Sequence, residues 1–199
     1  MAPLLVLGGL NMIANVKFAK VKPNAIIPSK RDEDMGFDIY ACFDEDYMII
    51  NPHETKLIPT GIASSCDSEY GFILRERGST GSKGIALRAG VIDSGYRNEW
   101  FVGLTNTTDK ILYISKFDKI ETVKKDIQKS EYADLFDDED VLLSSDEIDE
   151  MMILYPYTKA IAQALVIPVP TVTVEEISYE ELKSIKSERG MGALGSSNK

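Results

Sequence analysis

The residues best suited to chemistry lie in segment 89–99, which reads AGVIDSGYRNE. Asp93 follows the apolar strand AGVI and precedes a Ser-Gly turn. A carboxylate at the end of a strand, beside buried apolar surface, is a suitable general base. Tyr96, three residues further on, could lay its ring against a ligand. Asp93 has an alternative interpretation as a turn-former whose side chain bonds the backbone two residues on.

A glycine-rich segment, RERGSTGSKG at residues 75–84, follows the apolar strand GFIL. It is not a Walker A loop, because Lys83 is followed by Gly84 rather than by Ser or Thr and the glycine spacing differs. It does gather Arg77 and Ser79, with other hydroxyl and cationic side chains, around a permissive backbone. The segment is therefore a candidate anion site, with a plain turn between strands as the alternative.

The last residues, SERGMGALGSSNK, contain three glycines with the spacing G-x-G-x-x-G, which is typical of dinucleotide sites. No strand precedes the glycines and no helix follows them, so the spacing does not indicate a dinucleotide-binding fold. Glycines let backbone N–H groups converge on an anion, while Ser196 and Ser197 add hydroxyl donors and Arg189 adds a cation. The tail is either an anion-binding segment or a mobile end of the chain.

Composition argues against several classes of function. The 199 residues, 44% of them hydrophobic, suit one compact domain with a small appended element. A net charge of −10 argues against coating nucleic acid or an anionic membrane. His53 is the only histidine, which argues against Ser–His–Asp, Cys–His and His-rich zinc chemistry. Cys42 and Cys66 lack the spacing of a metal site or a redox motif. No segment is long enough to cross a bilayer, so we expect a soluble cytoplasmic protein.

The elements that must position these residues are mostly short strands. Segments rich in Val, Ile, Tyr, Phe and Thr, punctuated by Gly, Pro, Asn and Asp, read NVKFAKV, GFDIYAC, YMIINP, TKLIPTGIA, GFILRER, EWFVGLTN, KILYISKF and AIAQALVIPVPTVTV. No long amphipathic helix interrupts them, so we expect an all-β barrel or sandwich rather than a doubly wound sheet. Residues 1–11 are interpreted as an N-terminal extension, either native or vector-derived.

One segment, residues 116–156, departs from the strand pattern because it is acidic and helical in composition. Ser144 and Glu147 form a capping box for a helix that we expect to run through Met152. The segment is either a solvated excursion between two strands or an insert that binds a protein partner. A second capping box, in SYEELKSI, predicts a short helix near the C-terminus.

Five segments, taken in order, resemble the five motifs of the trimeric dUTPases, the deoxyuridine triphosphate pyrophosphatases. They are MGFDIYA (35–41), RGSTGSKG (77–84), AGVIDSGYRNE (89–99), KAIAQALVIPV (159–169) and ERGMGALGSS (188–197). The third is the most specific. The resemblance covers nearly everything except residues 1–11 and the acidic segment, and it points to the bacteriophage or bacterial type with an insert between the third and fourth motifs.

The resemblance implies a jelly-roll-like β-barrel formed by residues 12–115 and 157–186. The small helical or irregular acidic insert, residues 116–156, would interrupt the barrel. A flexible C-terminal arm, residues 187–199, would cross to a neighbouring subunit and close over its nucleotide. The family forms homotrimers in which all three chains build each active site, and the implied location is the cytoplasm of a bacterial or phage-infected cell.

The resemblance also implies hydrolysis of dUTP to dUMP and pyrophosphate, which keeps uracil out of DNA and supplies dUMP for dTMP synthesis. Asp93 matches the aspartate that orients and deprotonates the water that attacks the α-phosphorus. The implied cofactor is Mg²⁺, held by the substrate phosphates and water rather than by protein side chains. No nucleic-acid or membrane partner is expected.

Further site residues are carried over from the matching motifs. Asp38 and Gln163 are expected to support catalysis near the phosphates, and Tyr96 matches the tyrosine that packs on the deoxyribose and leaves no room for a 2′-hydroxyl. The implied substrate contacts are Arg77, Gly78 and Ser79 for the phosphates, the main chain around Leu87, Gly90, Val91 and Ile92 for the uracil, and Arg189, Leu194, Gly195, Ser196 and Ser197 from the arm.

The chain departs from the family pattern at three places, and two alternatives remain open. Gly78 stands where the family has serine, and Tyr157-Thr158 stand where the fourth motif usually begins Gly-Asp or Gly-Glu. Leu194 stands where a phenylalanine stacks on uracil, so we expect a weaker lid. A dCTP deaminase of the same fold would carry a glutamate at the position of Gly103. A regulatory member of the family would act through a protein partner bound by residues 116–156.

Overall fold

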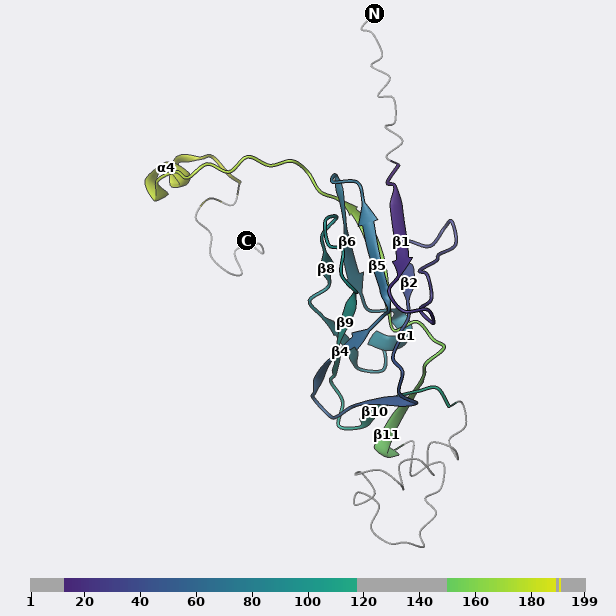
Figure 1. Cartoon of the computed structure of the whole chain (residues 1–199). Helices are drawn as coiled ribbons and strands as arrows, with labels where there is room; N and C mark the ends of the chain where they lie inside the picture. Colours follow the sequence, from purple (N-terminus) through teal and green to yellow (C-terminus); the bar gives the residue numbers. More distant parts are fainter. Residues whose placement is uncertain (1–12, 118–149, 189, 191–199) are drawn as a thin grey trace, which may run out of the picture. The chain divides into compact units, whose positions relative to one another are not determined.

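The computed structural model describes residues 13–117, 150–188 and 190, which belong to two compact units, Met1–Val169 and Pro170–Lys199. The expected N-terminal extension, residues 1–11, lies outside the described residues. The elements of the first unit are β1 (Val16–Lys20), β2 (Phe37–Ile39), β3 (Tyr47–Ile50), β4 (Thr55–Pro59), β5 (Ile62–Cys66), β6 (Tyr70–Arg75), α1 (Gly78–Gly81), β7 (Ile85–Arg88), β8 (Val91–Ile92), β9 (Phe101–Asn106), β10 (Ile111–Ser115), β11 (Met152–Pro156) and β12 (Ala162–Pro168) (Figure 1).

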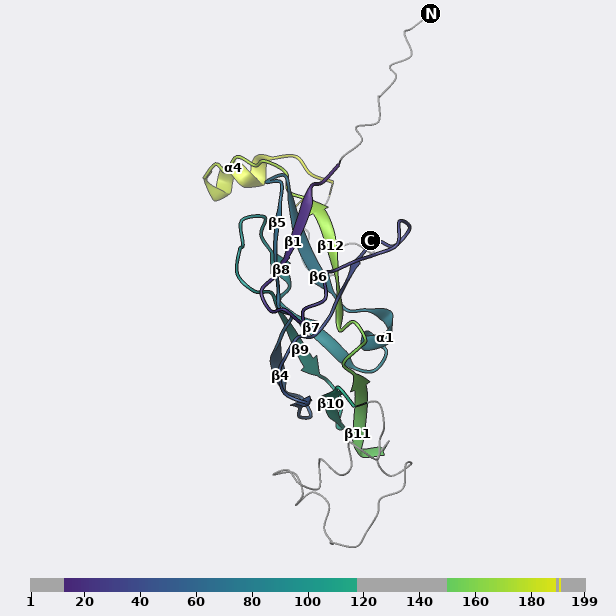
Figure 2. The ribbon, with the colours of Figure 1, turned by 45° about the vertical axis from the view of Figure 1, so that its right-hand side comes forward.

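The strands of the first unit form four small sheets. Their orders are β2-β12-β6-β8, β4-β9-β7, β11-β10-β3 and β1-β5. The described pairs are antiparallel except β10 with β11, which is parallel. Figures 1 and 2 show the strands wrapping around one another with α1 as a short turn at their side. The expected all-β fold is confirmed.

Two segments that were predicted as single strands change direction at residues with positive φ. The segment TKLIPTGIA divides into β4 and β5 at Gly61, whose φ is 66°. The predicted strand AGVI begins only at Val91, because Ala89 (φ 60°) and Gly90 (φ 112°) form the turn that joins β7 to β8. Such backbone is accessible to glycine at little cost, which is why these turns carry one.

The strand β11 overlaps the end of the acidic segment expected at residues 116–156, and it corrects the expected helix through Met152. The helical backbone ends at Met151, and Met152–Pro156 form a strand in register with Ile111–Ser115 of β10. The apolar sequence MILYP buries Met152 and Tyr155, which favours a buried strand over a solvated helix. Lys116 and Phe117 follow β10 directly, and residues 118–149 lie outside the described part.

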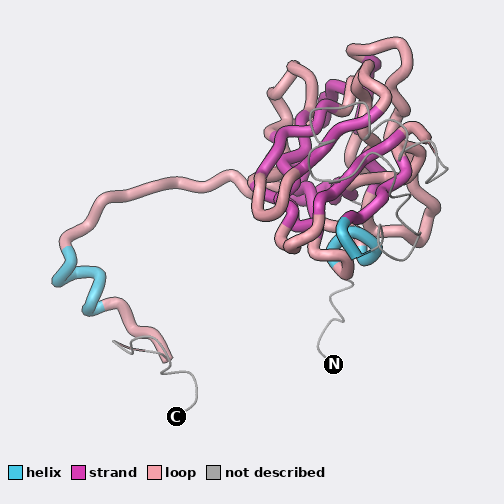
Figure 3. Tube along the Cα trace, turned by 90° about the horizontal axis from the view of Figure 1, so that it is seen from below, coloured by secondary structure: helices cyan, strands magenta, loops and turns pink. Residues whose placement is uncertain are grey.

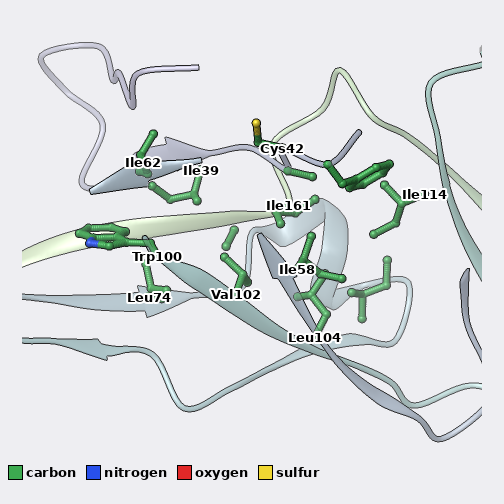
Figure 4. Close-up of a cluster of buried hydrophobic side chains, with 14 of the residues drawn as sticks. Ile39, Cys42, Ile58, Ile62, Leu74, Trp100, Val102, Leu104, Ile114 and Ile161 are labelled. Carbon is green, nitrogen blue, oxygen red and sulfur yellow. The ribbon is translucent and has the colours of Figure 1, made fainter. Parts of the chain in front are cut away.

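The main core collects apolar side chains from most strands of the first unit (Figure 4). Trp100 is fully buried and packs against Phe18 and Phe72 with ring centroids 5.7 and 5.0 Å apart. Fully burying an apolar side chain of this size contributes about 1.5–3 kcal/mol, so this core accounts for the placement of the strands around it. Other members labelled in Figure 4 include Ile39, Ile58, Leu74, Val102, Leu104 and Ile161.

The second unit has little buried surface within its described residues. Its helix α4 (Tyr179–Ser184) begins at Ser178, whose hydroxyl accepts the backbone N–H of Glu181 at 3.1 Å. This confirms the short helix predicted from the capping box (Figure 3).

The predicted strand AIAQALVIPVPTVTV ends at Pro168, because the prolines at 168 and 170 cannot donate to a strand ladder. None of the helices described is both long and apolar enough to span a membrane.

Candidate functional site

A polar cleft of about 760 Å³, here named the Arg77 cleft, lies where β2, β12 and α1 meet. Several of the residues expected to handle phosphate line it together. Its lining residues are Ser29, Lys30, Arg31, Asp34, Met35, Gly36, Asp38, Arg77, Gly78, Ser79 and Gln163. The cleft therefore gathers three cationic side chains, two carboxylates and small residues on one surface.

The turn α1 holds Arg77 in place at the end of β6. The hydroxyl of Thr80 accepts the backbone N–H of Arg77 at 3.0 Å, and the backbone N–H of Gly81 donates to the Arg77 carbonyl at 2.9 Å. Thr80 is buried, whereas Gly78 and Ser79 are exposed to the cleft. A Cβ at Gly78 would meet nothing within 4 Å, so space alone does not require glycine there.

Arg77 and Asp38 form an ion pair inside the cleft. The Arg77 Nε lies 3.0 Å from Asp38 Oδ1, and its Nη2 donates to Oδ2 at 3.4 Å. A third contact, from Arg77 Nη1 to the carbonyl of Ala160, adds a bond at 3.4 Å. Each of the two charged side chains is about one third exposed, at 31% and 34%. The guanidinium is thus preoriented, with part of its surface open to an anionic ligand.

Gln163 on β12 is placed beside both partners by strand register. It faces Asp38 on β2 and Arg75 on β6. Its Nε2 donates to the carbonyl of Glu76 at 2.8 Å, which leaves its Oε1 directed toward Gly36. A Cβ at Gly36 would lie 2.7 Å from that Oε1 and 3.1 Å from the Gln163 Cβ, so a larger residue at position 36 would require the Gln163 side chain to move.

A second, smaller hollow of about 230 Å³, here named the Asp93 pocket, lies beside residues 85–92. This segment, β7, its turn and β8, is called the hairpin below, although β7 pairs with β9 and β8 pairs with β6. It is lined by Val91, Ile92, Asp93, Tyr96 and Phe101. Val91, Tyr96 and Phe101 are exposed apolar side chains, at 74%, 38% and 44%. An apolar wall with one carboxylate suits a ligand that is partly apolar and partly polar.

The turn from Asp93 to Tyr96 is stabilised by the main chain of Asp93 and not by its side chain. The backbone N–H of Tyr96 donates to the Asp93 carbonyl at 3.1 Å. Within the described part of the chain, the Asp93 carboxylate makes no hydrogen bond or ion pair, so the alternative interpretation as a side-chain turn-former finds no contact to support it. Arg97 stabilises the same turn, because its Nη1 donates to the carbonyls of Ser94, Tyr96 and Ser64.

The hairpin is fixed on the barrel by Gly90. Its carbonyl accepts the backbone N–H of Leu74 at 2.7 Å. A Cβ at position 90 would lie 3.0 Å from the Leu74 carbonyl and 2.9 Å from Leu87 Cδ2, on a backbone with φ of 112°. Glycine is therefore required here both by conformation and by space.

In a single chain the Arg77 cleft and the Asp93 pocket share no lining residue. The structure brings Asp38, Arg77, Gly78, Ser79 and Gln163 together, and it places Val91, Ile92, Asp93 and Tyr96 together elsewhere. It does not bring Asp93 to the Arg77 cleft. The arm residues Arg189, Leu194, Gly195, Ser196 and Ser197 lie outside the described residues.

Sequence reasoning missed Glu76, whose carboxylate contacts the hairpin. Its Oε1 accepts the backbone N–H of Leu87 at 2.9 Å. This bond, the largest cause, and the bond from its own backbone N–H lower the pKa of Glu76 from its ordinary value. Glu76 follows β6 and Leu87 lies on β7, a strand of a different sheet, so their contact leaves no spacing signal in the sequence. The signal that could have indicated Glu76 is its position directly before Arg77, the first residue of the second motif.

The position that would carry the base of a deaminase is closed to a side chain. Gly103 on β9 is buried, and a Cβ there would lie 2.9 Å from the carbonyl of Arg88 on β7. The close pairing of β7 with β9 explains the glycine. Separately, the described residues contain no group of three or more His, Cys, Asp or Glu side chains arranged to hold a metal ion.

Comparison with known proteins identifies a family and a relative. A family model described as dUTPase matches residues 22–123. A deoxyuridine 5′-triphosphate nucleotidohydrolase of Leptospira interrogans is 33% identical over 119 residues, which cover 58% of this chain and 80% of that protein.

Two solved phage structures share the fold at low identity. The dUTPase of Staphylococcus bacteriophage 80alpha with dUPNHPP, from a study of phage dUTPases that control transfer of virulence genes, has a TM-score of 0.62 at 21% identity and covers 92% of this chain and 98% of that chain. A mutant dUTPase from phage phi11 of S. aureus, described with a structural Mg(II) ion, has a TM-score of 0.56 at 17% identity and covers 83% and 99%.

Proposed function

The chain belongs to the dUTPase family, and from this premise we propose that it hydrolyses dUTP to dUMP and pyrophosphate. The observation that carries the proposal is the Asp93 carboxylate, which has no partner among the described residues and lies beside an apolar pocket, together with a separate cleft that is rich in phosphate-binding groups. Water is the nucleophile in this reaction, so a single carboxylate base is sufficient chemistry.

The Arg77 cleft binds the triphosphate. Arg77 presents a planar fork of N–H donors that suits phosphate oxygens, and Asp38 holds that fork at a fixed angle. The family has a serine at position 78, where this chain has Gly78. The exposed hydroxyl of Ser79 takes over its role and donates to a phosphate oxygen of the substrate. Gln163 supports the cleft from β12, where its amide is already held by the Glu76 carbonyl.

Asp93 accepts a proton from water as the water oxygen forms a bond to the α-phosphorus. The bond from the α-phosphorus to the bridging oxygen of the β-phosphate breaks, and pyrophosphate leaves with that oxygen. Since no protein group competes for the Asp93 carboxylate within the described residues, it is free to orient the attacking water.

The Asp93 pocket binds the nucleoside. Tyr96 packs on the deoxyribose, and its hydroxyl is already held by the carbonyl of Glu99 at 3.1 Å, which fixes the ring. A fixed ring against C2′ excludes a 2′-hydroxyl by steric contact. The main chain from Leu87 to Ile92 reads the uracil, and Gly90 gives it the required turn.

The residues of the Arg77 cleft also fit a Mg²⁺ ion that is held mainly by phosphates. Asp38, Ser79 and Gln163 carry oxygen atoms there, and oxygen is the ligand that Mg²⁺ and its water shell prefer. When bound, Mg²⁺ neutralises part of the charge on the triphosphate. A dUTPase of the same fold, from phage phi11, is described with a structural Mg(II) ion.

Separation of the two surfaces supports a homotrimer with shared sites. Phosphate and nucleoside of one dUTP must be bound side by side, yet in one chain the two sets of residues line different hollows. A neighbouring copy that brings its Asp93 pocket to this chain's Arg77 cleft would complete the site. The arm, residues 187–199, is proposed to close over the nucleotide in the same assembly.

The test is one assay of dUTP, dCTP and UTP with Mg²⁺, in which pyrophosphate and ammonia are measured separately. Pyrophosphate release from dUTP alone is the expected result. Ammonia release from dCTP would instead support the deaminase, although the buried Gly103 leaves no space for its glutamate. Pyrophosphate release from none of the three would refute the proposal.

A second function, binding of a protein partner through residues 116–156, is favoured by one observation. The phage 80alpha relative comes from a study of phage dUTPases that control transfer of virulence genes. In this chain the segment connects two parallel neighbours, β10 and β11, so its two ends are anchored in one sheet. Replacing residues 118–149 with a flexible linker of about a dozen residues, which a crossover between parallel strands requires, should keep dUTP hydrolysis and abolish capture of the partner. Loss of the trimer instead would indicate a structural role.

A further inference from the structure

We infer that Glu76 is a positioning residue. Its side chain holds the hairpin that is proposed to bind the uracil, and its main chain is bonded to a residue of the Arg77 cleft. The inference rests on the proposed function, because the hairpin and the cleft are assigned there to the nucleoside and the phosphates. Glu76 is not among the residues that the motifs predict to contact the substrate, and it lines neither the Arg77 cleft nor the Asp93 pocket.

The side chain of Glu76 satisfies the free edge of β7. This strand pairs with β9 on one side and is the last strand of its sheet. An edge strand presents N–H groups without strand partners. Glu76 Oε1 accepts one of them, the N–H of Leu87, at 2.9 Å. A charged acceptor on a backbone N–H is among the stronger hydrogen bonds in proteins.

The main chain of Glu76 is held from the opposite side. Gln163 Nε2 donates to its carbonyl at 2.8 Å, and Gln163 itself lies against Gly36. The next residue in the chain is Arg77, which pairs with Asp38 at 3.0 Å. One residue therefore contacts the hairpin through its carboxylate and the phosphate-binding cluster through its backbone (Figure 2 shows β6, β7 and α1).

The surroundings of Glu76 favour its ionised form and hold it in position. Its side chain is 32% exposed, and Arg75 Nε lies 3.9 Å from Oε2. The hydrogen bond from the Leu87 N–H is the largest cause that lowers the pKa of Glu76. The positive charges of Arg75 and Arg88 lower this pKa further, whereas partial burial raises it. The carboxylate is consequently charged at neutral pH, when its bond to Leu87 is strongest.

Loss of this carboxylate should displace the hairpin more than the cleft. Leu87 would lose the partner of its N–H, while the Arg77–Asp38 pair and the Gln163 contact with the Glu76 backbone would remain. The nucleoside end of the site should therefore weaken and the phosphate end should not. This asymmetry distinguishes positioning from general destabilisation.

The experiment measures inhibition constants of dUMP and of inorganic pyrophosphate for the full chain, together with hydrogen exchange at the Leu87 amide. The variants are Glu76→Ala, Glu76→Gln and, as matched control, Glu54→Ala. Glu54 also accepts a backbone N–H through its carboxylate, that of Asn51 at 2.7 Å, in a turn that lines neither hollow.

Glu76→Ala should weaken dUMP inhibition about tenfold and accelerate Leu87 exchange by a similar factor, with pyrophosphate inhibition within about twofold of wild type. Glu76→Gln, which keeps an oxygen acceptor, should recover most of both losses. Equal weakening of dUMP and pyrophosphate, or an effect no larger than that of Glu54→Ala, would overturn the inference. If wild type neither hydrolyses dUTP nor binds dUMP, the proposed function fails, and the exchange rates still decide whether Glu76 holds the hairpin.

Discussion

At the scale of residues, carboxylates near the two surfaces differ by their partners. Asp38 is paired with Arg77, and Glu76 holds the Leu87 amide, whereas Asp93 has no partner among the described residues. A carboxylate that is bound by the protein serves geometry, and one that is left free can accept a proton from water. The three side chains thus separate into two with positioning roles and one suited to chemistry.

The bond between Glu76 and Leu87 predicts a pH dependence of stability. The folded protein lowers the pKa of Glu76 from its ordinary 4.5, so the ionised side chain stabilises the fold above about pH 4.5 and this contribution is lost as pH falls through the lowered value. Glu76→Gln lacks the titration. The gap in Tm between wild type and the variant should be widest at neutral pH and shrink in acid, as measured by thermal unfolding. A gap that stays constant from neutral to acid pH would contradict the assignment.

At the scale of elements, sequence patterns identified most strands, and the proposed site residues Asp93 and Tyr96 follow β8. Alternation and β-branched content are local properties, and so are capping boxes such as the one at Ser178. The strand Met152–Pro156 was missed because it borders an acidic, helix-like segment, and its pairing with β10 and the burial of Met152 and Tyr155 depend on the tertiary arrangement. The Glu76–Leu87 contact could not be predicted for the same reason, since it depends on tertiary arrangement.

The hairpin turn gives a prediction at this scale. Gly90→Ala places a Cβ 3.0 Å from the Leu74 carbonyl on a backbone with φ of 112°, so it should destabilise the protein by about 1–3 kcal/mol. Gly95→Ala is the matched control, because a Cβ there meets nothing within 4 Å and its φ is not positive. Chemical denaturation should separate the two variants, and equal stability would show that the turn is not constrained as described.

At the scale of the whole molecule, the motifs predicted which residues belong to the site but not how one chain divides them. Motif order predicts that Asp38, Arg77 and Gln163 lie near the phosphates, and in the structure these three residues line one cleft. That Asp93 lines a different hollow of the same chain follows only from the folded arrangement. This separation is the physical reason to propose an assembly with shared sites.

The second unit predicts a separation of activity from stability. The described residues from Pro170 onward contribute no side chain to either hydrophobic core. Ending the chain after Ser187 should therefore leave Tm nearly unchanged while dUTP turnover falls, because the proposed arm would be lost. Thermal unfolding and steady-state kinetics on the same preparation check this. Full activity in the shortened chain would remove the arm from the mechanism.

The most direct test of the account is the turnover of Asp93→Asn with dUTP and Mg²⁺, measured beside the affinity for dUMP. Asparagine keeps the size of the side chain and cannot accept the proton, so turnover should fall by about 10²–10⁴-fold while dUMP affinity stays near that of wild type. Turnover close to wild type would contradict the assignment of Asp93 as the base that activates water.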